Sequence, residues 1–266
     1  MRFQELTSLE EQKKFLDARV EEYNCKEFIV NDPISVAHRF TGKEDREIAG
    51  FLAATLAWGN RTQIIRNANA LINLMDDAPH SFLYNARERE FSTFLSFVHR
   101  TFNGEDCLFM IQALRNIYRE HGGMEEAFSV GYRKECNVQE AIFTFREKMF
   151  LTPHLQRSEK HIPNPFSGSA AKRINMFLRW MVRKDKKEVD FGIWNSIPPS
   201  ALMCPLDLHS GRVARSLGLL TRKQDDWKAV EELTARLRQF DAMDPVRYDF
   251  ALFGMGIHEK MNVWNK

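Results

Sequence analysis

The sequence predicts an all-α fold, and three kinds of observation lead to it. Apolar residues recur at helical spacing along most of the 266 residues, as over 48–56. Helix start signals recur too: residues 8–11 have capping-box spacing, and 32–33 and 244–245 each place an aspartate before a proline. No clean alternating run bounded by turns argues for a strand longer than a few residues.

Taken in chain order, the apolar stripes and caps predict about a dozen helices. The clearest are expected over 8–23, 43–58, 64–75, 108–118, 138–149, 169–183, 207–217, 226–239 and 244–255. Two proline-containing stretches, 151–167 and 191–205, lack periodicity and are expected to be long loops.

Bulk properties are those of a soluble globular protein that is large enough for one core or two small lobes. The content is 44% hydrophobic and 28% charged, and no apolar run approaches the roughly 18 residues that a membrane span needs. Because the N-terminal residues also lack the apolar centre of a signal peptide, we expect a cytoplasmic protein that contacts no membrane. The four cysteines are too far apart for a zinc or iron–sulfur motif, so we expect no metal and no cofactor.

The net charge of +2 is nearly neutral, so a general attraction to nucleic acid does not follow from the total. The distribution is less even, because residues 172–187 contain seven basic residues and one acid. This segment is either a surface that faces phosphates or an ordinary solvated helix face and turn.

The segment GSAAKRIN, residues 168–175, is the first candidate for chemistry. A turn of small residues that leads into a helix exposes unpaired N–H groups at the positive end of the helix dipole, which suits one phosphate. Lys172 lies in the first helical turn, where positive potential and partial burial lower a lysine pKa and favour nucleophilic attack. The alternatives are a simple N-cap at Ser169 and a surface lysine at 172.

The segment PLDLHSGRV, residues 205–213, is the second candidate. Asp207 is expected at or near the N-cap of a helix, which is sufficient reason for an aspartate there. An ionised carboxylate in a dry site also stabilises an oxocarbenium-like sugar and accepts a proton from an attacking amine.

Together, these two segments resemble the endonuclease-III-type helix-hairpin-helix DNA glycosylase superfamily. Residues 168–175 resemble the family hairpin G-V-G-x-K-T-A-N, and 205–213 resemble V-D-T-H-V-x-R-V, in the same order. The Leu-Gly-Leu at 217–219 and FALFGMG at 250–256 resemble the family's closing pattern. A weaker likeness joins FLAATLAWGNRT, residues 51–62, to the helix and turn L-L-S-x-Q-T-x-D.

The resemblance implies one two-lobed helical unit over 1–266, with lobes of 1–40 plus 190–266 and of 41–189 and the active site in the cleft between them. It implies a DNA repair enzyme that excises a damaged base from duplex DNA, with Lys172 as Schiff-base nucleophile, Asp207 as catalytic acid and an AP lyase step. By analogy, DNA contacts are expected at Asn60, Arg61, Ser167, Gly168, Ser169, Ala170, Arg173, His209 and Arg212. Trp58, Phe102 and Trp194 are candidates for stacking against the base, or core residues.

Several departures from the family pattern matter. Ala170 replaces the second hairpin glycine, and Lys172 and Asp207 are 35 positions apart (207 − 172), nearly twice the usual gap. A similar gap occurs in archaeal 8-oxoguanine glycosylases, which makes that oxidised base the expected substrate within an otherwise uncharacterised bacterial family. The chain also lacks the four-cysteine cluster of many relatives. A monomer is the default for this fold.

Two other interpretations remain open at this point. One is a catalytically inactive DNA-binding or scaffold protein of the same fold, for which changes at Lys172 and Asp207 would be neutral. The other is a helical interaction protein without a nucleic-acid role, in which these residues are a surface lysine and a helix cap. Salt-dependent duplex binding separates the second from the rest.

Overall fold

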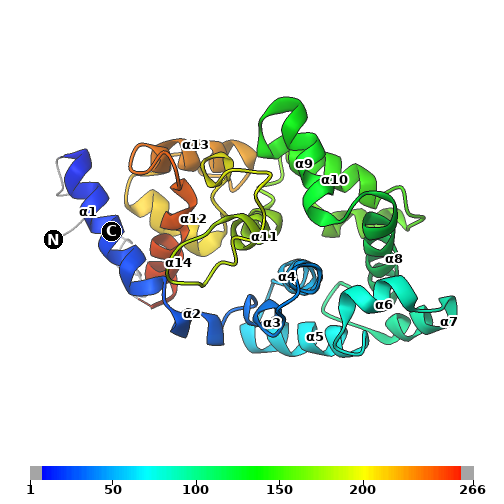
Figure 1. Cartoon of the computed structure of the whole chain (residues 1–266). Coiled ribbons are helices and arrows are strands. Elements are labelled where there is room, and N and C mark those ends of the chain that lie inside the picture. The colour runs from blue at the N-terminus through cyan, green and yellow to red at the C-terminus, as the bar shows by residue number, and fades with distance from the viewer. Residues whose placement is uncertain (1–7, 259–266) are drawn as a thin grey trace. The chain divides into compact units, whose positions relative to one another are not determined.

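The computed structural model describes residues 8–258, which form fourteen α-helices and no strand. Two isolated β-bridges, His99–Phe102 and Ser169–Asp226, are the sole β-type pairings in this part of the chain. The helices are α1 Leu9–Tyr23, α2 Lys26–Val30, α3 Ser35–His38, α4 Lys43–Thr55, α5 Arg61–Asn73, α6 Pro79–Asn85, α7 Glu88–Phe91, α8 Gly104–Glu120, α9 Met124–Glu135, α10 Val138–Met149, α11 Lys172–Val182, α12 Leu208–Ser216, α13 Trp227–Arg238 and α14 Asp249–His258 (Figure 1). The all-α prediction is therefore confirmed.

The chain divides into two compact units whose boundaries differ from the expected lobes. Of the described residues, the first unit contains 8–28 and 165–258, and the second contains 29–164. Residues 165–189 thus belong with the C-terminal segment, and 29–40 belong with the middle of the chain. The buried contacts of α11 explain the first difference, because Arg179 on this helix pairs with Asp190 and Asp249.

In the first unit, α14 lies against both α1 and α12 (Figure 1). The sequence of α14 is apolar on nearly every side, as expected for a helix with neighbours around it. Close packing here requires a glycine at 254, because a Cβ at this position would lie 2.2 Å from the Tyr23 ring. Since α12 begins directly after Asp207, this packing fixes the position of one candidate catalytic residue.

In the second unit, α9 and α10 form an antiparallel helical hairpin, and α4 packs against α3, α5 and α6 (Figure 1). The core between these helices is aromatic: Phe128 stacks on Phe145 with 4.1 Å between ring centroids, and Phe51 meets Phe145 edge-on. Gly131 allows α9 to approach α10, because a Cβ there would lie 2.5 Å from the Glu140 carbonyl oxygen.

Most predicted helix bounds agree with the structure to within a few residues. The capping box at Ser8 and Glu11 is present, and the loops 151–167 and 191–205 contain nothing longer than short 3₁₀ turns. Three helices begin later in the chain than expected. The Asp32-Pro33 signal leads to a turn before α3, α11 begins at Lys172 rather than at 169, and a 3₁₀ turn at Pro245–Tyr248 precedes α14.

Across residues 8–258, none of the helices is both long and apolar enough to cross a membrane. The longest, α8, is amphipathic and buries one face in the second unit.

Candidate active site

The turn before α11 is open to solvent on one side. Gly168 adopts a φ of +86°, and a Cβ at this position would meet nothing within 4 Å, so the backbone is open to a ligand on that side. Ala171 is also left-handed, with a φ of +47°, and the Ser169 hydroxyl accepts a hydrogen bond from its N–H at 3.2 Å. The left-handed residues of this turn are thus 168 and 171, and Ala170 needs no positive φ.

Two further contacts hold this turn in place. The buried Asn175 side chain donates to the Ala170 carbonyl at 3.1 Å, and the Trp227 N–H donates to the Gly168 carbonyl at 3.1 Å. The late start of α11 follows from the left-handed Ala171, since a helix cannot continue through that conformation. Lys172 consequently becomes the first residue of the helix.

Asp207 is the N-cap of α12, as predicted. Its Oδ1 accepts from the N–H groups of His209 at 2.8 Å and Ser210 at 3.0 Å, and the Ser210 hydroxyl accepts from the Asp207 N–H at 2.9 Å. These bonds occupy Oδ1 and fix the carboxylate plane.

The second oxygen of the same carboxylate faces Lys172. The distance from Lys172 Nζ to Asp207 Oδ2 is 3.6 Å, and the two side chains are 24% and 23% exposed. Lys172 Nζ also lies 3.6 Å from Met176 Sδ, one turn along α11. The sequence separates these residues by 35 positions (207 − 172), yet the fold brings amine and carboxylate into contact at the N-termini of two helices.

Electrostatics keep Asp207 ionised. Burial raises the pKa of this carboxyl, but attraction to Lys172 and the N–H groups of Ser210 and His209 outweigh it, and the pKa is lowered overall. A carboxylate that stays charged while partly desolvated can stabilise positive charge and accept a proton from its neighbour.

Behind this pair lies a buried ion network that the sequence analysis did not foresee. Arg179 pairs with Asp190, at 3.2 Å from its Nε, and with Asp249, while Arg183 pairs with Asp190, Asp244 and Asp185. The two arginine side chains are only 4% and 3% exposed. Both interpretations of 172–187, a phosphate-facing surface and a solvated helix face, must therefore be corrected at Arg179 and Arg183, which point into the first unit and neutralise carboxylates there.

Asp249 is the most perturbed carboxyl in this network. Burial raises its pKa to about 6, and the negative charges of Asp207 and Asp190 add to this effect, while Arg179 and Lys172 oppose it. Between its unfolded pKa of 3.8 and about 6, the folded protein holds a proton that the unfolded chain has released. Asp249 therefore contributes stability at low pH that is lost as pH rises through about 6.

We expect an Asp249→Asn variant to reveal this titration. The free energy of unfolding of the wild type, minus that of the variant, should fall by about 2 kcal/mol from pH 4 to pH 7. Urea unfolding at several pH values measures it. Asp226→Asn is the control: because the pKa of Asp226 is lowered to about 2, the corresponding difference should change little between about pH 5 and pH 7. An Asp249→Asn difference that is independent of pH would contradict the prediction.

The other predicted residues of the first unit vary in accessibility. Ser167, Gly168, His209 and Arg212 are exposed, whereas Ser169 and Ala170 are half-buried. Arg173 is half-buried as well, and desolvation lowers its pKa to about 10. Trp194 is 2% exposed and packs edge-on against Phe177, so it is a core residue rather than a stacking surface.

The second unit holds the remaining predicted residues. Asn60 is exposed and caps α5 by accepting from the Gln63 N–H at 3.1 Å, and Arg61 is the first residue of that helix. Trp58 is half-buried and meets His99 edge-on, with 4.8 Å between ring centroids. Phe102 is fully buried and belongs to the core, which removes it as a base-stacking candidate in this structure.

Sequence reasoning missed two features of the first unit: the Arg179–Asp249 pair and a pocket bordered by Arg222, Lys223 and Lys228. The sequence did contain an indication that Asp249 has a buried partner, since it is a charged residue at the start of an otherwise apolar helix. Among the described residues, no group of three or more His, Cys, Asp or Glu side chains could hold a metal ion.

Comparison with known proteins gives a family without a described activity. No curated protein and no solved structure matches the chain. One family model, described as a protein of unknown function, DUF2400, matches residues 32–258, which include Lys172 and Asp207. The chain therefore belongs to the DUF2400 family.

Proposed function

We propose that this protein has the helix-hairpin-helix glycosylase fold and is a DNA glycosylase that excises a damaged base from duplex DNA. The observation that carries the proposal is the Lys172–Asp207 pair, with amine and carboxylate 3.6 Å apart at the N-termini of two helices. A nucleophile beside a proton acceptor, with the acceptor oriented by further hydrogen bonds, is the arrangement that covalent catalysis needs. Asp207 meets the last condition through its capping bonds to 209 and 210.

In the proposed reaction, Asp207 takes the proton that Lys172 must lose before it attacks. The amine lone pair then forms a bond to the anomeric carbon of the sugar, and the glycosidic electron pair leaves with the base, which takes up the proton held by Asp207. The Asp207 carboxylate stabilises positive charge that develops on the sugar. Opening of the sugar ring gives an imine on Lys172, and β-elimination from that imine nicks the strand.

DNA binding is proposed for the hairpin that precedes α11. The open side of Gly168 lets a phosphate approach the backbone, and the N-terminus of α11 directs N–H groups and positive dipole potential to the same place. The exposed Ser167 and the half-buried Ser169 add hydroxyl groups. Binding through phosphates predicts an affinity that falls steeply with salt.

The substrate that we propose first is an oxidised purine such as 8-oxoguanine, because of the wide sequence separation of Lys172 and Asp207. The deciding experiment uses the wild-type protein and a panel of duplexes, each with one lesion, and measures release of the free base and affinity at about 50 and 200 mM salt. Release of one base supports the glycosylase. Salt-dependent binding without release across the panel would instead favour an inactive DNA-binding protein, and absence of binding at low salt would end the DNA hypothesis.

A further inference from the structure

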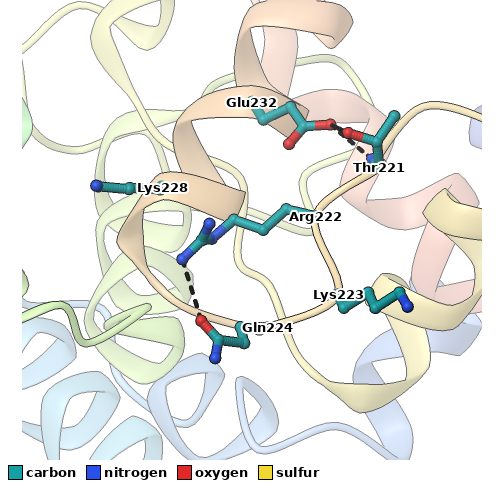
Figure 2. Close-up of a pocket in the computed structure, with 6 residues that line it drawn as sticks. All are labelled: Thr221, Arg222, Lys223, Gln224, Lys228 and Glu232. Carbon is teal, nitrogen blue, oxygen red and sulfur yellow. Dashed lines mark hydrogen bonds between the residues drawn. The ribbon is translucent and has the colours of Figure 1, made fainter.

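A pocket of about 500 Å³ lies in the first unit, lined by Thr221, Arg222, Lys223, Gln224, Lys228 and Glu232. Its residues come from the loop between α12 and α13 and from the first turns of α13. Figure 2 shows Arg222 between Lys223 and Lys228, whose amines extend on either side of it.

The carboxylates around this pocket are each held by a partner. Glu232 accepts from both the N–H and the hydroxyl of Thr221 at 2.6 Å (Figure 2). Asp226 binds Arg222, whose guanidinium also donates to Gln224 at 3.1 Å, and Asp225 pairs with Arg215 at 2.6 Å. These bonds tie the loop to α12 and α13 and compensate the charge of Arg222.

The two lysines differ from these groups. Both Lys223 and Lys228 are exposed, and neither forms a salt bridge within residues 8–258. The pocket therefore presents two exposed amines, of which Lys228 helps to lower the pKa of Asp226 without forming a salt bridge to it. Two such amines suit ligands that carry several negative charges along their length.

The pocket is also joined directly to the hairpin. Ser169 and Asp226 form a β-bridge, and the Trp227 N–H donates to the Gly168 carbonyl at 3.1 Å. Lys228 follows Trp227 in the chain, so its backbone lies beside the proposed phosphate-binding turn. Because phosphates recur about every 3.4 Å along the axis of each DNA strand, a strand that reaches Gly168 carries further phosphates past this pocket.

We propose that this pocket binds backbone phosphates of the same DNA duplex, through Lys223 and Lys228, and extends the contact made by the hairpin. The inference rests on the proposed function, since the hairpin must bind DNA for a strand to reach the pocket. It adds a positioning surface that is independent of the bases and of the Lys172–Asp207 chemistry.

The test measures duplex affinity against salt for Lys223→Gln, Lys228→Gln and the double variant. Each phosphate contact contributes about 0.9 to the slope of log affinity against log salt, so each single change should reduce the slope by about 0.9 and weaken binding about eightfold at 0.1 M salt. A variant with Lys14→Gln and Lys160→Gln is the matched control, because it removes the same charge at two exposed positions outside the pocket. Its slope should stay close to that of the wild type.

A second arm locates the phosphates. It uses duplexes in which one phosphate at a time is replaced by a neutral methylphosphonate. When the replaced phosphate is one that contacts the pocket, the wild type should bind the duplex less tightly than the unmodified duplex. The double variant should bind these two duplexes equally tightly. If the wild type binds DNA and releases a base but the pocket variants behave as the control does, this inference is overturned and the glycosylase stands. If the wild type does not bind duplex DNA, both fail.

Discussion

Replacement of Lys172 by glutamine is expected to abolish the covalent adduct that borohydride traps between the protein and a duplex carrying the substrate lesion. The imine needs a primary amine at the anomeric carbon, and the amide of glutamine supplies none. The amine of Lys172 is the group that contacts Asp207 Oδ2. Adduct formation should therefore fall below detection, while duplex affinity changes by less than about tenfold, because one charge contributes one phosphate contact at most.

Asp207→Asn is the companion variant and separates two mechanisms. It preserves the size of the side chain and one capping oxygen for the N–H groups of 209 and 210, but it removes the carboxylate charge. Base release should fall by about 10²- to 10⁴-fold with affinity retained, which is the range for losing a proton acceptor. Base release by Lys172→Gln but not by Asp207→Asn would assign a hydrolytic reaction that depends on Asp207 alone. An adduct that persists in Lys172→Gln would show that another amine is the nucleophile.

How far the sequence predicts this molecule depends on whether a feature is local. The α12 cap at Asp207 and the capping box of α1 were predictable, since a cap and the N–H groups that it satisfies lie within three residues. The start of α11 was not, because the left-handed conformation of Ala171 depends on contacts made by Asn175 and Trp227 with the turn. Helix existence was therefore predicted better than helix ends.

The candidate site shows the same division. The pairing of 172 with 207 came from the order of two motifs, and the structure adds the distance between their side chains. The distribution of charge along the sequence did not predict which basic residues are exposed. Arg179 and Arg183 face carboxylates that are distant in sequence, rather than solvent. Phe102 and Trp194 are likewise too buried to stack against a base. Their positions beside turns in the sequence did not indicate this burial.

The buried charge of Arg179 is expected to contribute strongly to the free energy of unfolding. We expect Arg179→Met to destabilise the protein by about 3–5 kcal/mol at pH 7, because it leaves the buried carboxylates of Asp190 and Asp249 without this partner. Urea unfolding measures the change. Arg19→Met is the matched control, since its exposed partner Glu22 lies on the same helical surface, and its loss should cost less than about 1 kcal/mol.

The pH dependence distinguishes charge from packing as the cause. Arg179 also covers the Phe250 ring, at 4.3 Å from the centroid, so loss of this contact alone would destabilise the protein equally at all pH values. Loss of charge compensation acts differently. Without Arg179, whose charge lowers the pKa of Asp249, that pKa should rise above its present value of about 6, and protonation removes the uncompensated charge. The destabilisation by Arg179→Met should therefore be smaller at pH 5 than at pH 7. An equal loss at both would assign the effect to packing on Phe250.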